Sequence, residues 1–224
     1  LGAEKFLDIK CRKAQIKPDA VVIVVTIKAL KYHGGIEKDK IQEENLDGLK
    51  NGMNNLYRHI ENLKNKFGLN VIVAINKFNT DTENELAYIQ EDLNEKNIQC
   101  SLVEGWEKGG EGGIELAKAI LRTLDNKESN YKPLYTYDDT TIEEKIETIA
   151  TKIYGADKVV YTAAAARQKK RLTELGYGNL PICMAKNQYS LSDDPKKLGR
   201  PEGFDITIRE IYVNAGAGFL VALT

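Results

Sequence analysis

Residues 20–35 read AVVIVVTIKALKYHGG, an apolar run that ends in hydroxyl, basic and imidazole groups and then in two adjacent glycines. This profile predicts a buried parallel strand at about 20–26 whose carboxyl end opens into a polar crevice, the place where open α/β sheets bind their ligands. A long helical pattern follows, and Gly68 ends it. The apolar segment at 71–76 then predicts a second buried strand.

The segments that follow continue the alternation of helices and strands. A capping-box pattern at 82–85 predicts the start of a helix, and 99–103 is a short strand candidate. A glycine-rich turn at 109–113 precedes a helical pattern at 114–124. Strand–helix–strand units favour right-handed crossovers and parallel strands. We therefore expect an α/β fold with a mostly parallel sheet and flanking helices, similar to an incomplete P-loop NTPase-like layer.

A polar stretch at 125–139 is the best candidate for a domain boundary. We expect residues 1–130 to form the first α/β region and residues 131–224 a smaller C-terminal α/β domain. In the second part, apolar residues alternate with polar ones over 204–208, and the alternation resumes out of phase at Ile211. This shift predicts a β-bulge near Arg209-Glu210. Both ends of the chain lack the polar character usual at domain edges, so we expect a truncated piece of a longer protein.

Composition excludes several classes of function. The formal net charge is −1, which gives no bulk attraction to nucleic acid or to a membrane surface. No apolar stretch approaches the roughly 20 residues needed to span a bilayer, and the first residues do not form a leader. The three cysteines are widely separated and the two histidines lack partners at ligand spacing, so neither a disulfide framework nor a metal site is indicated. We expect a cytoplasmic protein.

The second strand is followed directly by NKFNTDT at residues 76–82. Asn76 can offer a donor and an acceptor to the edge of a heterocycle, and the stem of Lys77 can pack along its face. The pattern is similar to the Asn-Lys-x-Asp element of GTP-binding proteins, although Asp81 stands two positions late. A GTPase-like regulatory module that uses Asn76 and Lys77 is therefore one alternative. An ordinary strand-to-helix turn with Asp81 or Thr82 as the cap is another.

Two aromatic residues follow neighbouring strands of the expected sheet. Phe78 lies after the strand at 71–76, and Trp106, the sole tryptophan, lies after the strand at 99–103. If the two loops meet, the rings can sandwich a flat heterocycle. Taken alone, both rings would more often be core aromatics, although Trp106 is flanked by glycine and charged residues, which is less typical of a core position. Gly109 and Gly110 indicate either a tight turn or a close approach of the backbone to a ligand.

Three residues after the first strand are candidates for chemistry. Lys28 and Lys31 can place positive charge beside an anionic intermediate. His33 stands beside two glycines and can hydrogen-bond a phosphate or orient a substrate. The residues alone leave open whether His33 is functional or structural.

Several ordered blocks of the chain resemble the formate–tetrahydrofolate ligases. These blocks are the opening LGAEKFLDIKCR, the segment at 20–35, NKFNTDT, EGWEKGG at 104–110, LPICMAKNQYSLSDDP at 180–195, GRP at 199–201 and GAGF at 216–219. The resemblance covers essentially the whole chain. Departures are Val25 for the family's usual Ala, Asn187 for its common Thr, and Lys28 for its usual Arg, which keeps the charge and loses the planar fork.

The resemblance implies an enzyme that joins formate to the N10 position of tetrahydrofolate, using ATP and passing through formyl phosphate. It implies ATP with Mg²⁺, formate and tetrahydrofolate as substrates, a response to monovalent cations, no tightly bound cofactor and a homo-oligomer. In the family, the residues that match Phe78 and Trp106 line the pteridine pocket. The catalytic candidates are then Lys28, Lys31 and His33. The folate- or nucleotide-binding candidates are Asn76, Lys77, Phe78, Asp81, Trp106, Gly109 and Gly110.

One expected element of the family is absent from the printed sequence. No GxxxxGK[ST] loop occurs, although the ligases carry such a phosphate-binding loop ahead of this region. We therefore expect the isolated chain to be inactive as a ligase. Lys186 and Ser190, in the last polar loop, are further candidates for substrate contact.

Overall fold

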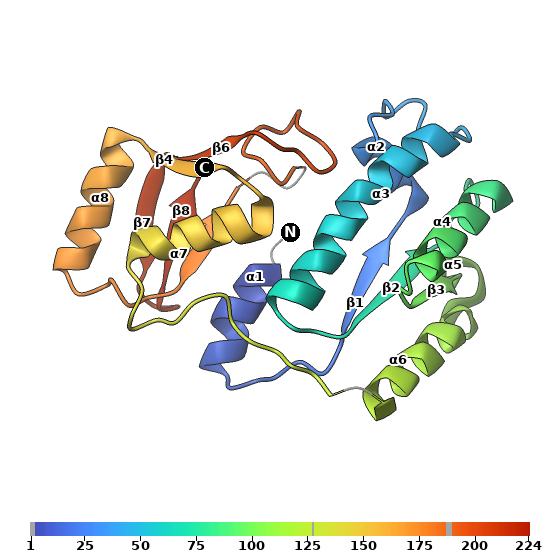
Figure 1. The fold of residues 1–224 in the computed structure, drawn as a ribbon, viewed down its shortest axis with the longest axis horizontal. Helices are drawn as coiled ribbons and strands as arrows, with labels where there is room; N and C mark the ends of the chain where they lie inside the picture. Colours follow the sequence, from blue (N-terminus) through green and yellow to red (C-terminus); the bar gives the residue numbers. More distant parts are fainter. Residues whose placement is uncertain (1–2, 127, 187–189) are drawn as a thin grey trace. The chain divides into compact units, whose positions relative to one another are not determined.

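The computed structural model describes residues 3–126, 128–186 and 190–224 (Figure 1). The chain divides into two compact units. One, the central unit, is Pro18–Tyr131. The other, the split unit, combines residues 3–17 with Lys132–Thr224. The central unit ends at Tyr131, within the polar stretch at 125–139. Residues 3–17, which we expected in the first region, instead belong to the unit formed by the C-terminal part of the chain.

The central unit contains a three-stranded parallel sheet in the order β1-β2-β3 (Figure 1). The strands are β1 (Val21–Val25), β2 (Val71–Asn76) and β3 (Cys100–Val103). The prediction of parallel strands at these places is confirmed. Because parallel strands end at the same edge, the segments that follow β1, β2 and β3 are brought side by side.

Two long helices cover one face of this sheet. α3 (Leu46–Glu61) continues into a π-helical segment, Asn62–Lys66, and the chain turns at Gly68, whose φ is +72°. α4 (Glu83–Glu95) begins at the predicted capping box, in which Thr82 and Glu85 satisfy one another's backbone N–H groups. The core on this face includes Leu49, Met53, Leu56, Val73, Ile75, Leu86, Ile89 and Leu93.

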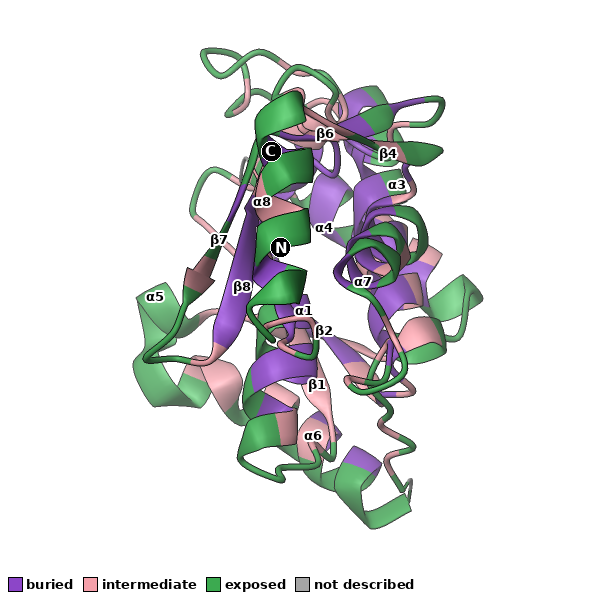
Figure 2. Cartoon of the chain, turned by 90° about the vertical axis from the view of Figure 1, so that its left-hand side faces the viewer, coloured by how far each residue is buried: buried purple, intermediate pink, exposed green. Residues whose placement is uncertain are grey.

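α6 (Ile114–Asn126) packs mainly against β3, an edge strand of the sheet, and also contacts β2. The Gln99 side chain donates to the Ala119 carbonyl at 3.2 Å and accepts from the Thr123 hydroxyl at 2.7 Å. β1 is one of the two edge strands of this sheet, and Val24 is 66% exposed there, although we expected a buried strand. In Figure 2, buried residues are purple, and most of β1 is instead coloured as only partly buried.

The segment after β1 is a helix, α2 (Ile27–His33), where the sequence predicted a polar crevice. Thr26 caps it by accepting a hydrogen bond from the Ala29 N–H at 3.1 Å. Because the apolar residues Ile27 and Leu30 are buried, this helix joins the core of the central unit.

Glycines allow α2 and α3 to approach at backbone distance. A Cβ atom on Gly52 would lie 1.9 Å from the Leu30 carbonyl oxygen, and one on Gly34 would lie 1.8 Å from that of Gly48. Neither position has room for a larger residue. This close approach fixes α2, and with it the residues that follow β1, on α3.

The split unit contains two further sheets. β4 (Lys158–Tyr161) pairs in parallel with β6 (Asp205–Ile208). β5 (Ile182–Ala185) is parallel to β8 (Phe219–Leu223), and β7 (Glu210–Asn214) is antiparallel to β8. β4 was not expected from the sequence.

The predicted bulge near Arg209-Glu210 is wrong. β6 and β7 belong to different sheets, and Arg209 is the residue at which the chain passes from one to the other. The out-of-phase alternation therefore comes from a change of sheet and not from an extra residue within one strand.

Helices complete the split unit. α1 (Ala3–Lys5) continues as a π-helical segment, Phe6–Cys11, whose Ile9 packs on β8. α7 (Ile142–Thr148) continues into Ile149–Tyr154, and α8 is Ala163–Glu174. Ile142, Ile146, Ile149 and Ile153 lie on one face of this helical segment and are all buried. Within the described part of the chain, no helix has the length and apolar character needed to cross a bilayer.

Candidate functional site

The carboxyl edge of the central sheet brings two predicted loops together. Asn76, the last residue of β2, pairs in register with Val103, the last residue of β3. The Lys77 N–H then donates to the Val103 carbonyl at 2.9 Å. The loop that carries Phe78 and the loop that carries Trp106 therefore start side by side.

Lys77 points its ammonium at two carboxylates. Its Nζ lies 3.4 Å from Glu104 Oε1 and 3.5 Å from Glu83 Oε1. Partial desolvation opposes the charge, but the hydrogen bonds and charges of Glu104 and Glu83 outweigh it and raise the pKa of Lys77. The lysine therefore stays protonated and is held between acidic side chains.

Asp81 closes the turn that presents Phe78. Its Oδ2 accepts from the Phe78 N–H at 2.8 Å, and its own N–H donates to the Phe78 carbonyl at 2.9 Å. Burial raises the pKa of Asp81, while the Phe78 N–H acts in the opposite direction. The carboxylate is thus occupied by the turn, and the cap of the following helix is Thr82 and not Asp81.

Lys28 and Phe78 come together from different strands. Lys28 lies in the first turn of α2 and Phe78 follows β2, yet the Lys28 Nζ is 5.3 Å from the Phe78 ring centroid. This is within the range of a cation–π interaction. A positive charge therefore lies beside the half-buried ring.

Trp106 is 80% exposed and lies on a four-residue helix, α5 (Gly105–Lys108). It is therefore not a core aromatic. The ring pairs seen in the described residues join Tyr32 to His33 and Tyr135 to Tyr137. Over that same part of the chain, Trp106 makes no ring contact with Phe78, so its faces are not occupied by the other aromatic.

The glycine-rich segment Gly109–Gly113 forms a tight 3₁₀ turn. Gly109 has φ +57°, which favours glycine. A Cβ atom on Gly112 would lie 2.5 Å from the carbonyl of Glu104, whereas one on Gly110 would meet nothing within 4 Å. Of the two possibilities left open for this segment, the structure shows the tight turn.

Lys31 is closed to solvent and is held by an acidic partner. Its Nζ is 2.8 Å from Glu85 Oε1 and donates to the Glu43 carbonyl at 2.8 Å. The two side chains are 1% and 0% exposed. Burial opposes ionisation of Glu85, but Lys31 and the Asn45 N–H together lower its pKa. These contacts are those of a residue that joins elements of the fold.

His33 is the last residue of α2, at the far end of that helix from Lys28. Its ring stands edge-on to Tyr32, with centroids 6.0 Å apart. Burial lowers the pKa of His33, so the imidazole is neutral at pH 7. A neutral ring can donate from one nitrogen and accept at the other.

The last polar loop lies in the split unit. Lys186 donates to the Ser190 carbonyl and lies 5.1 Å from the Tyr154 ring centroid. Burial lowers the pKa of Lys186 to about 8. Asn187, which stands where the family commonly has Thr, lies outside the residues that the structure describes.

Sequence reasoning missed Glu104. Its carboxylate contacts Lys77 and also Lys108, 2.5 Å away. The only available signal was position, since Glu104 stands between a predicted strand and the sole tryptophan. A carboxylate between the strand and the tryptophan can form ion pairs with lysines on either side, but the order of residues does not identify Lys77 and Lys108 as its partners.

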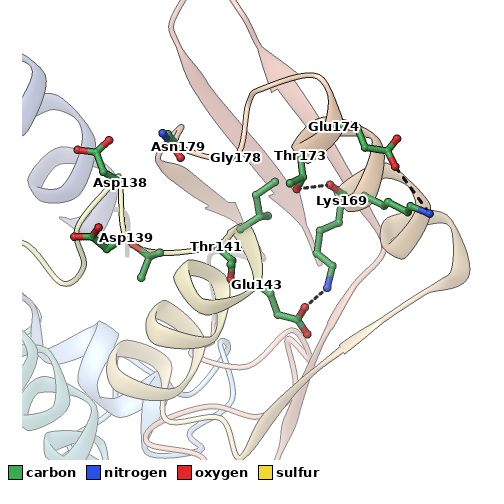
Figure 3. Close-up of a pocket in the computed structure, with 12 residues that line it drawn as sticks. Asp138, Asp139, Thr141, Glu143, Lys169, Thr173, Glu174, Gly178 and Asn179 are labelled. Atoms are coloured by element: carbon green, nitrogen blue, oxygen red, sulfur yellow. Dashed lines mark hydrogen bonds and ion pairs between the residues drawn. The ribbon is translucent and has the colours of Figure 1, made fainter.

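A separate cavity of about 540 Å³ lies between α7 and α8 in the split unit (Figure 3). Two of its lining lysines are paired with acids that also line it, Lys169 with Glu143 and Lys170 with Glu174. None of the residues singled out from the sequence lines this cavity. We therefore place the candidate site at the edge of the central sheet.

The described ranges contain no group of three or more His, Cys, Asp or Glu side chains placed to hold a metal ion. One comparison with known proteins bears on the whole chain. The family model described as formate–tetrahydrofolate ligase matches residues 1–224.

Proposed function

The chain belongs to the formate–tetrahydrofolate ligase family, and we propose that it binds the pteridine of tetrahydrofolate between Phe78 and Trp106. The observation that carries this proposal is the pairing of Asn76 with Val103, which starts the two aromatic loops side by side. Trp106 is exposed and Phe78 is half-buried, so both can present a ring face to a flat ligand. Stacking on aromatic rings contributes on the order of 1 kcal/mol beyond burial.

We propose different roles for the three catalytic candidates. Lys28 is the cation that faces an anionic group of the substrate, because its ammonium already lies beside the Phe78 ring. Lys31 holds α2 in place through Glu85 and does not touch substrate. His33, neutral and half-buried, is a hydrogen-bonding group at the far end of α2.

The reaction that we propose for the family has two steps, and we propose that the isolated chain does not complete it, because the printed sequence has no GxxxxGK[ST] loop. A formate oxygen attacks the γ-phosphorus of ATP, ADP leaves, and formyl phosphate forms. The N10 amine of tetrahydrofolate then attacks the formyl carbon, the bond from carbon to the phosphate oxygen breaks, and inorganic phosphate and the amine proton are released. Charge neutralisation and positioning dominate phosphoryl transfer, so a lysine such as Lys28 suits the first step. Mg²⁺ enters this proposal only as the companion of ATP.

The geometry gives no support to a GTPase-like module. In that alternative Lys77 would lie along a base and Asp81 would read its edge. Lys77 is instead held by Glu104 and Glu83, and Asp81 accepts from the Phe78 N–H. Asn76 alone is left for base recognition, and one amide does not select guanine.

A fluorescence titration tests the proposal, because Trp106 is the only tryptophan. We expect a non-reactive folate analogue to change Trp106 emission in a saturable way, and GTP to leave it unchanged. The variant Phe78→Leu should weaken the response to folate, while Leu121→Ala, at an exposed position on α6, should bind as the parent chain does. A parent chain that responds to GTP and not to folate would reject the proposal.

We further propose that the protein acts as a homo-oligomer and responds to monovalent cations, as the family resemblance implies. Light scattering at several protein concentrations tests the first point. A monomer mass throughout the range would contradict it. Folate titrations in potassium and in tetramethylammonium buffers test the second, since only the smaller cation should strengthen binding.

A further inference from the structure

We propose that Glu104 is a positioning residue, whose carboxylate ties the loop that presents Phe78 to the helix that presents Trp106. This inference rests on the proposed folate site and adds to it a residue that sets the relation between the two rings. Glu104 itself does not touch the folate.

The carboxylate of Glu104 bridges two lysines, one in each loop. Oε1 lies 3.4 Å from the Nζ of Lys77, the residue before Phe78, and Oε2 lies 2.5 Å from the Nζ of Lys108, two residues after Trp106. The hydrogen bond from Lys108 and the charge of Lys77 lower the pKa of Glu104, so it is ionised at neutral pH. Its side chain is 21% exposed, which limits screening by solvent compared with a fully exposed pair.

The backbone of Glu104 closes the loop that carries Trp106. The Glu104 N–H donates to the Gly112 carbonyl at 3.1 Å, and the Glu104 carbonyl accepts from the Lys108 N–H at 2.9 Å. A side chain on Gly112 would collide with the Glu104 carbonyl, so glycine is required at this closure. The loop is therefore held at Glu104, and the carboxylate extends that attachment to Lys77.

Little else fixes the position of Trp106. The ring is 80% exposed, and a helix of four residues is not stable by its own hydrogen bonds. A ring that is ordered before the ligand arrives loses less conformational freedom on binding. We therefore expect Glu104 to act on folate affinity and on the mobility of Trp106, and not on the chemical step.

The experiment compares the parent chain with Glu104→Gln and Glu107→Gln. Glu107 is an exposed residue of the same short helix, so its variant is a matched control. Trp106 fluorescence anisotropy is measured without ligand, and the dissociation constant is then measured with a folate analogue. We expect Glu104→Gln to lower the anisotropy and weaken binding roughly fivefold, within the usual range for coupled neighbours. Glu107→Gln should change neither quantity, and circular dichroism checks that each variant is folded.

A double-mutant cycle separates positioning from a general loss of structure. The variants are Lys77→Met, Glu104→Gln and their combination. If the carboxylate acts through Lys77, the effects on Trp106 anisotropy and on affinity will be less than additive. Fully additive effects would overturn the inference.

The outcomes distinguish this inference from the proposed function. If the parent chain and Glu104→Gln bind folate equally and have equal anisotropy, Glu104 is not a positioning residue and the folate site stands. If no chain binds folate, the proposed function fails, and the ligand-free anisotropy still decides whether Glu104 orders Trp106. A lower anisotropy in Glu104→Gln alone supports the inference in either case.

Discussion

Lys31 and Glu85 form an ion pair that is closed to solvent, with Nζ and Oε1 2.8 Å apart and side chains 1% and 0% exposed. Glu85 also accepts from the Asn45 N–H at 2.9 Å, just ahead of α3, and belongs to the capping box of α4. One carboxylate therefore joins α2, the start of α3 and the start of α4. Removing either charge leaves the other buried without its partner.

We predict that Lys31→Met lowers the free energy of unfolding by about 3–5 kcal/mol, because it leaves the Glu85 charge uncompensated. The double variant Lys31→Met/Glu85→Leu should recover much of that loss. The control is Lys118→Met, whose pair with Glu115 is exposed and should contribute little to stability. Urea unfolding gives the free energy of unfolding of these three variants and of the parent chain. A Lys31→Met chain within 1 kcal/mol of the parent would show that the pair is not needed.

Gly52→Ala should be among the most destabilising small substitutions in the central unit. The new Cβ would lie 1.9 Å from the Leu30 carbonyl oxygen, so α2 and α3 must move apart. We expect a loss of about 3 kcal/mol or more in thermal or urea unfolding. Asn51→Ala, at the preceding exposed position of α3, should change stability by less than about 0.5 kcal/mol.

Trp106→Ala should separate ligand binding from stability. The side chain is 80% exposed, so we expect the free energy of unfolding to change by less than about 0.5 kcal/mol. Affinity for a folate analogue should fall about fivefold or more, since a stacking face of on the order of 1 kcal/mol is lost. Calorimetry is the suitable measurement because the variant has no tryptophan. Unchanged affinity would contradict the proposed role.

Asp8 predicts a pH dependence of stability in the split unit. Its carboxyl is fully buried, and burial raises its pKa to about 7 from an ordinary value of 3.8, against the Leu134 N–H that donates to Oδ1. Below pH 4 both the folded and the unfolded chain hold this proton. Between about pH 4 and pH 7 only the folded chain holds it, so stability falls as pH rises, by at most about 4 kcal/mol. Above that range the contribution is constant.

The test of the Asp8 prediction is Asp8→Asn, which keeps an oxygen for the Leu134 N–H and removes the ionisation. Urea unfolding at pH 4.5, 6 and 8 should show a smaller decline for the variant than for the parent chain. At pH 8 the variant should be the more stable of the two. Parallel curves for the two chains would contradict the prediction, since the titrating group would then be elsewhere.

Local sequence signals predicted the central unit well. Apolar runs gave the positions of β1 and β2, and the Thr82–Glu85 spacing gave the start of α4, because these elements depend on neighbouring residues. The polar residues after the strands gave the sheet edge at which Lys28 and Phe78 meet. β4 was missed because it is only four residues long and its residues are exposed or half-buried, so it gives no clear apolar signal.

Features that depend on distant partners were not predictable. Periodicity cannot distinguish a bulge from a change of sheet, which is why the passage at Arg209 was misinterpreted. The burial of Lys31 depends on Glu85, 54 positions later, and so the lysine looked available for catalysis. Glu104 has two basic partners, but nothing in the order of residues indicates that its carboxylate reaches both.

The division of the chain has a consequence for its synthesis. The central unit is contiguous, and Asn70 joins its two ends by donating to the Asp19 and Glu128 carbonyls. Domains generally fold as units in the order in which they leave the ribosome. Residues 3–17 emerge before the central unit, yet their partners at 132–224 emerge after it. Residues 3–17 must therefore remain without these partners while the segment that follows them completes its own sheet.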